Sequence, residues 1–522
     1  MENTVMLDDW LHWVKEGWTM LPLLAKSSKV YPELPETWKK AWQTSSPYSF
    51  VLESGKGGRY TYLGLEPVSV LTGKGTAGQV RNLMTGDIQK LQGKPLHLLK
   101  EWMEPYRSPR VPGWPDFQGG CAGFLGYDVI RTLEQLPALA RDDAGFPDYL
   151  WMRMEEVWIY DHHEQALYCA VHSPWDHEHP SDRETLTRLY HQAEDRLHHM
   201  LSRWDDFMDS AVNEGRDSCD QSSRRLKAQS LLGPDVAGWD ALDSDFSQEA
   251  FEQAVRSIQE YIRNGDVFQV NLSLRRKLRL KSDPADVYEW LRILNPSPYM
   301  GYITSPDFKL ASGSPELLVK LAGDRVSARP IAGTRRRGAS PEEDAAMETE
   351  LLHTEKERAE HIMLVDLERN DIGRIAAYGS VHVPELMTIE RYSHVMHLVS
   401  QVEGRLACGK QAYDVIAATF PGGTITGAPK IRTMEIIEEL EPVTRGPYTG
   451  SMGWIDYNGD MELNIIIRTL AVQDGIGYIQ AGAGIVIDSD PYREYRECHN
   501  KAKALIAAVM CSEEETASAA LT

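Results

Sequence analysis

Two segments far apart in the sequence carry pairs of glutamates at a spacing of three residues. Both segments have the pattern of a helix, so each pair lies on one helical face. Carboxylate ligands suit a hard cation such as Mg²⁺ rather than zinc, so two such faces could hold one ion between them. The alternative is two solvated charged faces. The four candidate ligands are Glu357, Glu360, Glu494 and Glu497.

Each glutamate pair has a predicted helix start near it. Thr354 and Glu357 form a capping-box pattern, which predicts a helix that begins at this point and places His361 on the same face as the glutamates. The second helix is predicted to begin with Asp490 as its N-cap and Pro491 at its first position. A metal site requires that the fold bring these two helices together.

The composition is that of an ordinary globular protein with an acidic surface. The chain has 522 residues, of which 42% are apolar and 25% charged. A formal net charge of −22 disfavours nucleic acid and anionic membranes as partners. No apolar run approaches the roughly 18 residues of a membrane span, and the N-terminus lacks the apolar core of a signal peptide. The six cysteines have no paired spacing, so we expect reduced thiols and a cytoplasmic protein.

The chain divides into two β-containing regions joined by a polar segment. Short runs rich in β-formers indicate antiparallel strands within residues 1–204, the N-terminal region. Residues 205–245 are polar and acidic with little periodicity, which is typical of a linker. Residues 246–510 alternate capped helices with strands and contain all the catalytic candidates, and residues 511–522 are predicted to be a tail.

The glycine-rich sequence GGCAG at 119–123 has two interpretations. It fits the pattern G-x-C-x-G, which in some amidotransferases is a nucleophile elbow and would here make Cys121 reactive. It also shares an outline with GSMGWIDY at 450–457, which indicates a glycine-bearing strand used twice, as in an internal duplication. The shared outline favours the second interpretation.

Several further positions could contact a ligand. Apolar and polar residues alternate along the strand that contains Gln269, so this amide points to solvent or into a polar cavity. The glycine-rich loop 420–430 precedes a predicted helix, which is typical either of an anion site or of a tight turn. Arg468 ends an aliphatic strand and needs a carboxylate partner if it is buried. Gly482 and Gly484 interrupt an apolar strand, where glycine often marks close approach to a ligand.

Together these segments resemble the chorismate-utilising enzymes, the family of anthranilate synthase component I, aminodeoxychorismate synthase component I, isochorismate synthases and salicylate synthases. The resemblance covers nearly the whole chain. It implies an α+β fold in which two facing antiparallel β-sheets form a sandwich with helices packed on the outside. It rests on PIAGTRRRG (330–338), EKERAEHIMLVDLERND (355–371), FPGGTITGAPK (420–430), AGAGIV (481–486) and the closing E-x-x-E-x-x-x-K.

The resemblance implies a role for each candidate. Glu316 corresponds to the general acid that protonates the leaving C4 hydroxyl of chorismate, and burial near other carboxylates would raise its pKa. His397 is a candidate proton-transfer group, and Thr424 matches a remaining site position. The four glutamates correspond to the Mg²⁺ ligands, directly or through water. The substrate carboxylates would be bound by Tyr448, Arg468, Gly482, Ala483, Gly484 and Lys501.

The residue at position 269 and the sequences of two segments distinguish the branches of the family. Members that use water carry a lysine base where this chain has Gln269, which orients ammonia but cannot deprotonate water. Isochorismate and salicylate synthases are therefore disfavoured. FPGGTITGAPK and VFQVNLS favour an aminodeoxychorismate synthase, which serves p-aminobenzoate and folate synthesis, over anthranilate synthase as the alternative. Ala332 replaces the attacking lysine of some aminodeoxychorismate synthases, which excludes a covalent lysine intermediate there.

The resemblance also implies partners and a possible regulator. We expect a separate glutaminase subunit to supply ammonia, because the chain has no room for a glutaminase domain. VLES and NPSPYM resemble tryptophan-binding elements of the family, so Ser54, Tyr299 and Met300 are candidates for a regulatory or purely structural tryptophan pocket. A non-catalytic tryptophan-binding subunit is a third hypothesis, and the retained carboxylates disfavour it.

Overall fold

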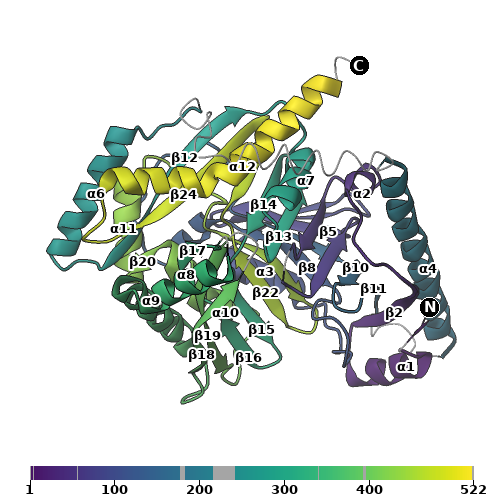
Figure 1. Cartoon of the computed structure of the whole chain (residues 1–522). Coiled ribbons are helices and arrows are strands. Elements are labelled where there is room, and N and C mark those ends of the chain that lie inside the picture. The colour runs from purple at the N-terminus through teal and green to yellow at the C-terminus, as the bar shows by residue number, and fades with distance from the viewer. Residues whose placement is uncertain are drawn as a thin grey trace.

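The strands of this computed structural model form two large antiparallel sheets, with helices on the outside (Figure 1). The structure describes residues 2–3, 5–55, 57–176, 183–214, 242–338, 340–391 and 395–519. Aromatic rings from both sheets meet in the core, where the centroids of Phe124 and Phe308 lie 5.5 Å apart and those of Tyr62 and Trp454 lie 6.0 Å apart. This confirms the predicted α+β sandwich.

Both sheets mix strands from the two ends of the chain. The first sheet has the order β1 (Glu2–Asn3), β2 (Met20–Val30), β11 (Ala166–Pro174), β10 (Glu156–Asp161), β4 (Tyr60–Gly64), β3 (Ser49–Glu53), β13 (Tyr299–Thr304), β14 (Phe308–Ser314), β23 (Thr469–Gln473), β24 (Ile476–Ile485), β12 (Gln269–Arg279) and β20 (Gly427–Ala428). The second has the order β17 (Ile331–Arg336), β19 (Val395–Arg405), β16 (Arg325–Ala328), β15 (Leu317–Ala322), β22 (Met461–Ile465), β21 (Ser451–Asp456), β8 (Gly120–Leu125), β9 (Tyr149–Met154), β5 (Ser69–Lys74), β6 (Ala77–Asn82) and β7 (Ile88–Gln92), and β18 (His382–Arg391) pairs with β19.

The helices carry the caps that the sequence predicts, with one exception. Ser247 and Asp490 accept from backbone N–H groups of the first turns of α6 and α12. Thr354 is the N-cap of α9, but its hydroxyl donates to Glu350 O, so the predicted capping box with Glu357 is wrong. The helices are α1 (Leu7–Glu16), α2 (Lys39–Gln43), α3 (Pro95–Met103), α4 (Arg183–Glu214), α6 (Gln248–Arg263), α7 (Pro284–Leu294), α8 (Pro341–His353), α9 (Glu355–Gly373), α10 (Ala412–Thr419), α11 (Lys430–Leu440) and α12 (Pro491–Ala519).

The strand order reveals an internal duplication. In the first sheet β3 pairs with β13, and outward from this seam β4, β10, β11 and β2 correspond to β14, β23, β24 and β12. In the second sheet β8 pairs with β21, and β9, β5 and β6 correspond to β22, β15 and β16. The corresponding strands occur in the same order along the chain, so the two halves follow one plan. They lie side by side in Figure 1, with the N-terminal half in purple and blue.

The glycine-bearing strands compared above form the seam of the second sheet. Gly123 lies opposite Gly453, and a Cβ on either would come within 2.0 Å of a backbone carbonyl oxygen. Cys121 lies within β8, is fully buried, and burial raises the pKa of its thiol. The structure therefore supports the duplication and not the nucleophile elbow.

Two predicted boundaries fall inside helices. α4 continues to Glu214 because Phe207 packs into the core, so the first part of the predicted linker 205–245 is helical. Residues 215–241 lie outside the described residues. α12 continues to Ala519 because Cys511 is fully buried, so the predicted tail 511–522 begins as helix. Both sheets run through the regions 1–204 and 246–510, which therefore share one core.

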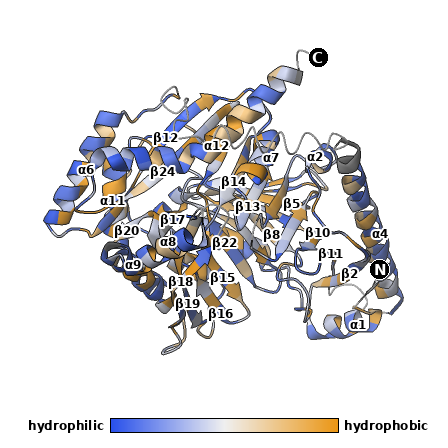
Figure 2. Ribbon diagram, viewed as in Figure 1, coloured by the Kyte–Doolittle hydropathy of each residue, from blue (hydrophilic) through white to orange (hydrophobic). Residues whose placement is uncertain are grey.

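Apolar residues concentrate in the strands and polar residues on the outward sides of α4, α6 and α12 (Figure 2). The apolar core is one large cluster with strands from both halves, and a second cluster lies under α9 and α10. Among the described residues, we find no helix with the length and apolar character that a membrane crossing requires.

Candidate active site

Several segments meet on β12 around Gln269. β20 pairs with β12 at Gln269, and β24 pairs on the other side with Gly484 opposite Asn271. Glu360 of α9 approaches from a third direction, and its Oε1 accepts from Gln269 Nε2 at 3.4 Å. Gly427 has a φ of +135°, and a Cβ there would lie 2.1 Å from Gln269 O, so a side chain would push the loop off β12. Gln269 lines a polar interior and does not meet solvent.

Glu316 has the protonation behaviour of a general acid. It lies in the turn between β14 and β15 and is only 8% exposed. Burial raises its pKa to about 7, and the Thr424 hydroxyl, Lys501 and Arg468 act in the opposite direction. Burial therefore causes the rise, and the neighbouring charges oppose it. A substantial fraction of Glu316 is protonated at neutral pH, so it can donate a proton.

Arg468 lies near Glu316, and His397 lies near Arg468. Arg468 has a φ of +51°, which is uncommon for a residue with a side chain. No carboxylate of the described residues lies within ion-pair distance of its guanidinium, and its main electrostatic neighbour is Glu316. Burial, with a smaller contribution from Arg468, lowers the pKa of His397 to about 4, so the imidazole is neutral at pH 7. The guanidinium is available to a ligand carboxylate.

The glycines of β24 make room for two amide side chains of β12. A Cβ on Gly484 would lie 2.3 Å from Gln269 Nε2, and one on Gly482 would lie 2.4 Å from Asn271 Oδ1 and 2.8 Å from Tyr448 Oη. These glycines therefore admit neighbouring side chains to the site. Ala483 is fully buried in the core, so only its backbone remains a candidate for ligand binding.

The predicted metal ligands lie on α9 and α12. Glu357 pairs with Arg335 at 3.0 Å, and Glu497 pairs with Lys501 at 2.8 Å. Lys501 also donates to Gly482 O at 2.9 Å, which ties α12 to β24. Within the described part of the chain, no three His, Cys, Asp or Glu side chains lie close enough together to hold a metal ion. The structure does not gather the four glutamates around one centre.

The chemistry of these four residues nevertheless fits Mg²⁺. All four would supply carboxylate oxygens, the ligands that Mg²⁺ prefers. Glu357 and Glu497 each compensate a cationic side chain, Arg335 and Lys501, so a metal ion would replace these cations as the partner of the two carboxylates. Glu360 contacts Gln269, and Lys501, the partner of Glu497, contacts Gly482, so both helices reach the same strand pair.

The structure brings the three predicted tryptophan-pocket residues together. Ser54, Tyr299 and Met300 line a pocket of about 40 Å³ with Met452 and Trp454. Typical small-molecule sites have about 300 Å³ or more, so this pocket alone is too small for an indole ring. A neighbouring cleft of about 700 Å³ shares Ser54 and Tyr299 with it.

Asn271 is a site residue that the sequence analysis did not select. It is 8% exposed, and its Nδ2 donates to Thr424 O at 3.4 Å. Its Oδ1, like Gln269 Oε1, is buried and has no hydrogen-bond partner among the described residues. The strand alternation that places Gln269 on the polar face also places Asn271 there, so the signal was present in the sequence.

A buried ion pair behind the site also escaped the sequence analysis. Arg445 donates to both carboxylate oxygens of Glu441, at 2.6 and 2.9 Å. It also donates to Ile425 O at 3.0 Å and to Asn271 O at 2.7 Å, and Glu441 accepts from Ser273. The pair therefore fixes the loop 420–430 relative to β12.

Two buried carboxyls of α9 were missed as well. Glu368 and Asp371 are 5% and 3% exposed, and burial raises the pKa of both. Lys430 at the start of α11 pairs with Asp371. The Glu316 carboxylate adds to the rise in the pKa of Glu368, so these acids belong to the surroundings of the site.

Comparison with known proteins agrees with this geometry. The sequence model of the family described as chorismate binding enzyme matches residues 48–507. The chain is 46% identical to aminodeoxychorismate synthase component 1 of Bacillus subtilis (strain 168), over 90% of this chain and 94% of that protein. It is 43% identical to anthranilate synthase component 1 of Thermus thermophilus, over 92% of this chain and 96% of that protein.

A solved structure shows the same fold. Anthranilate synthase component I from Streptococcus pneumoniae TIGR4 matches with a TM-score of 0.67 and 34% sequence identity, over 86% of this chain and 92% of that chain. The family model covers most of the sequence, and the relatives match nearly end to end. The chain therefore belongs to the chorismate binding enzymes.

Proposed function

We infer that this chain is component I of an aminodeoxychorismate synthase, which aminates chorismate to 4-amino-4-deoxychorismate. The observation that carries this inference is the 46% identity, over 90% of the chain, to a protein of that name. Gln269 supports amination, because a buried amide next to the site binds ammonia but cannot act as a base toward water. The product would serve p-aminobenzoate and folate synthesis.

Glu316 would provide the proton that the reaction needs. The C4–O bond of chorismate breaks, a C–N bond forms, and the hydroxyl leaves as water with the proton that Glu316 donates. The incoming ammonia loses one proton, which restores Glu316. His397 is a candidate relay for that proton, because its imidazole is neutral and lies close enough to Arg468 for the guanidinium charge to lower its pKa. Ala332 offers no nucleophile, so no covalent bond to that position is part of the reaction.

The substrate carboxylates would be bound by cationic and polar groups around Glu316. Arg468 has no carboxylate partner among the described residues, so its guanidinium suits a ligand carboxylate. Lys501 and Tyr448 both lie at Gly482, close to Asn271. Burial lowers the pKa of the Arg468 guanidinium, because its charged form is costly away from water. A bound anion would reduce that cost.

Mg²⁺ would be held by Glu357, Glu360, Glu494 and Glu497. When bound, Mg²⁺ would draw charge toward the ring carboxylate as the hydroxyl leaves. The salt bridges of Glu357 and Glu497 with Arg335 and Lys501 would open to free these carboxylates. Two observations support this assignment: all four residues offer carboxylate oxygens, and their helices, α9 and α12, both contact the strand pair β12 and β24.

A glutaminase subunit would supply the ammonia. The relatives are named component 1 of their synthases, which implies a second component. We place the complex in the cytoplasm because of the acidic composition and the unpaired spacing of the cysteines.

Mass spectrometry of the product tests the proposed function. Purified protein with chorismate, ammonium chloride and Mg²⁺ should form an amine that retains the enolpyruvyl group. Anthranilate synthase is the alternative, and its support is the 43% identity to the Thermus thermophilus protein. Anthranilate and pyruvate as the main products would overturn our choice. No turnover at all would favour a non-catalytic subunit.

A further inference from the structure

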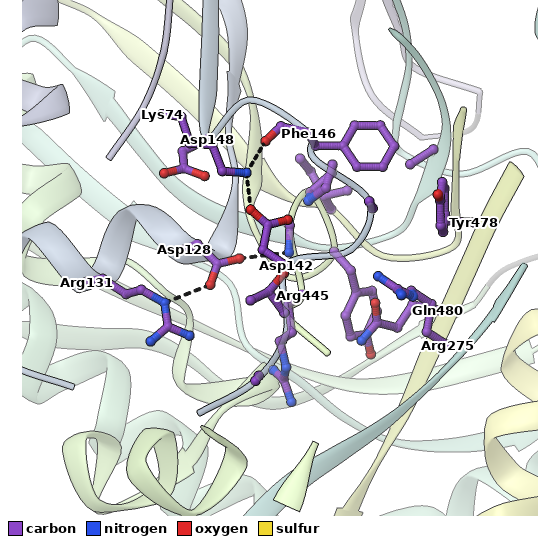
Figure 3. A pocket seen from close by; sticks show the side chains of 18 of the residues that line it. Lys74, Asp128, Arg131, Asp142, Phe146, Asp148, Arg275, Arg445, Tyr478 and Gln480 are labelled. Atoms are coloured by element: carbon purple, nitrogen blue, oxygen red, sulfur yellow. Dashed lines mark hydrogen bonds and ion pairs between the residues drawn. The ribbon is translucent and has the colours of Figure 1, made fainter. Parts of the chain in front are cut away.

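A cavity of about 320 Å³ lies next to the candidate active site, with which it shares Tyr448; Figure 3 shows other residues that line it. Its outer wall is the loop 138–146, in which Ala138 and Asp142 are exposed. Its inner wall includes Tyr448 and Gln480. Tyr448 lines this cavity and also places its hydroxyl at Gly482, so one side chain touches both the cavity and the site.

The charged side chains that line this cavity have partners within the protein. Lys74 pairs with Asp142 and donates to Phe146 O at 2.8 Å, and Arg275 pairs with Asp143 at 2.6 Å. The remaining lining pairs are Asp128 with Arg131, Arg131 with Glu438, Asp148 with the N–H of Gly75, and Arg445 with Glu441. A cavity whose charges are compensated in this way suits a small neutral molecule better than an ion.

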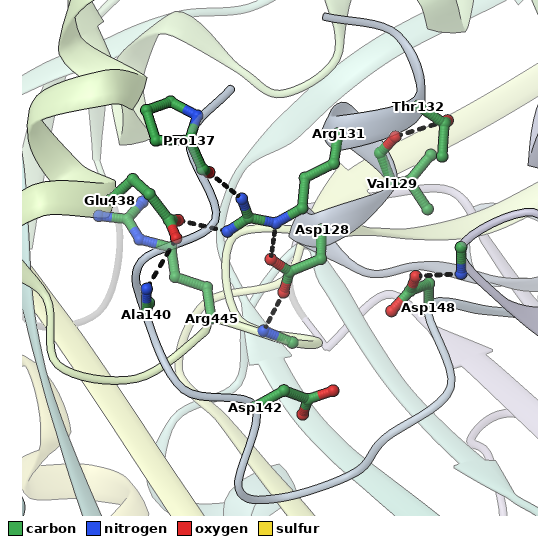
Figure 4. A network of polar contacts seen from close by, with 12 residues as sticks. Asp128, Val129, Arg131, Thr132, Pro137, Ala140, Asp142, Asp148, Glu438 and Arg445 are labelled. Carbon is green, nitrogen blue, oxygen red and sulfur yellow. Dashed lines mark hydrogen bonds and ion pairs between the residues drawn. The ribbon is translucent and has the colours of Figure 1, made fainter. Parts of the chain in front are cut away.

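The loop over the cavity is held in place. Glu438 of α11 accepts from the N–H groups of Leu139 and Ala140 at 2.6 and 2.8 Å, and it also pairs with Arg131 (Figure 4). Arg131 donates to Pro137 O at 2.6 Å. These contacts hold the start of the loop against Arg131 and α11.

A row of polar side chains leads from the cavity to the site. On β12, strand alternation places Arg275, Ser273, Asn271 and Gln269 on one face. Arg275 lines the cavity, and Gln269 contacts Glu360 at the far end. On β24 the neighbouring Gln480 lines the cavity and donates to Ser273 Oγ at 2.7 Å, and Arg275 and Gln480 lie together in Figure 3.

The row ends on two unsatisfied acceptors. Asn271 Oδ1 and Gln269 Oε1 are buried carbonyl oxygens without a hydrogen-bond partner among the described residues. A buried acceptor without a donor is costly, and a ligand that donates a hydrogen bond to it would remove that cost. Ammonia carries three N–H donors. Amide oxygens at these positions would bind it without taking its proton or converting it to ammonium.

We propose that ammonia enters through the cavity behind Tyr448 and moves along the polar face of β12 to Asn271 and Gln269. This inference rests on the proposed amination. It assigns the cavity to a neutral nitrogen nucleophile and Asn271 to ammonia binding. Chorismate would occupy the other side of Tyr448, near Arg468 and Lys501, so the two substrates reach the reaction centre from different directions.

Filling the cavity tests this route. Ala144 and Ala140 are half-buried in the loop and line the cavity, so Ala144→Trp and Ala140→Trp should each obstruct it. Ala345→Trp on the exposed side of α8 is the matched control. We expect kcat/KM for ammonia, measured with ammonium chloride and chorismate, to fall at least fivefold in both cavity variants. KM for chorismate in the cavity variants should stay within twofold of the wild-type value. The same limit should hold for kcat/KM for ammonia in the control variant.

Three outcomes separate the two claims. Wild-type kcat/KM for ammonia in both cavity variants, with native circular dichroism, would overturn the entry route. An equal loss in the kinetics of chorismate and ammonia would indicate a general distortion and would also count against it. If the wild type itself forms no aminated product from ammonium chloride, the proposed function fails and the entry route with it.

Asn271→Leu should raise KM for ammonia more than KM for chorismate.

Discussion

At the scale of single residues, burial sets the protonation states that the reaction needs. Burial raises the pKa of Glu316 to about 7 and lowers that of His397 to about 4. The acid is therefore partly protonated and the imidazole neutral at the same pH. The proposed amination uses both states, because the protonated carboxyl can donate a proton to the leaving hydroxyl and the neutral imidazole can accept a proton from the incoming nitrogen.

Replacing Glu316 separates its catalytic effect from its effect on stability. Glu316→Gln should lower kcat by about 10²-fold or more, since one positioned acid contributes about 10²–10⁴-fold. The pKa of Glu316 is higher in the folded than in the unfolded protein, so its stabilising effect is present below pH 4.5 and is lost as the pH rises through about 7. The variant lacks this loss and should have a higher Tm than the wild type at pH 8.

The pH profile of the wild type gives a second test of Glu316. A general acid must be protonated, so kcat should fall as the pH rises above about 7 at a fixed concentration of unprotonated ammonia. Steady-state rates from pH 6 to 9 measure this fall. A profile that is flat across this range, or a lower Tm of Glu316→Gln at pH 8, would contradict the assignment.

Glu497 tests the metal proposal because its side chain is 48% exposed. Glu497→Gln should abolish Mg²⁺-dependent turnover and change the free energy of unfolding by less than about 1 kcal/mol, as exposed ion pairs contribute little. Glu513→Gln on the same helix is the control. Titration of turnover with Mg²⁺ and urea unfolding measure the two effects. Wild-type activity in the Glu497 variant would remove this residue from the site.

At the scale of elements, the Arg445–Glu441 pair determines where the loop 420–430 lies. Arg445 joins α11, through Glu441, to the carbonyls of Ile425 and Asn271. Its planar guanidinium reaches these acceptors in different directions, which a lysine cannot do. The positions of Thr424 and Gln269 both depend on this connection, because Ile425 follows Thr424 and β20 pairs at Gln269.

Arg445→Lys should therefore impair the site while keeping the charge. We expect a loss of about 2–4 kcal/mol in the free energy of unfolding, since buried hydrogen-bonded pairs are costly to break. We also expect a larger change in kcat than in KM for chorismate, because Gln269 and Thr424 move relative to Glu316. Urea unfolding and steady-state kinetics measure both. Arg369→Lys, in an exposed pair with Asp366, is the control and should change neither.

The elements also show what the sequence could and could not predict. Periodicity and capping predicted α6, α9 and α12 and the polar face of β12 that carries Gln269, because these signals are local. The capping box at Thr354 failed because its hydroxyl found a carbonyl in the preceding helix. Arg445, Glu441 and the cavity depend on contacts between segments far apart in the chain, which no local pattern encodes. The four glutamates remain a prediction from the family resemblance.

At the scale of the whole molecule, the duplication makes each half incomplete. The N-terminal and C-terminal halves pair through β3 with β13 in one sheet and through β8 with β21 in the other. Buried charges reinforce the first seam, where Arg292 of α7 pairs with Glu53 of β3 at 3.0 Å and Trp38 donates to the same carboxylate. Every candidate catalytic residue lies in the C-terminal half, yet that half is not a structural unit.

Separating the halves should therefore unfold the catalytic one. Residues 242–519 alone would expose the edges of β13 and β21, both central and largely buried strands, and unpaired apolar edges associate with other chains. We expect this fragment to aggregate or to lack near-ultraviolet circular dichroism, although it contains the whole candidate site. Co-expression with residues 1–214 should restore a folded complex, because both seams bury apolar residues from each side. A monomeric, folded and active fragment 242–519 would show that the seams merely join two units that are stable on their own.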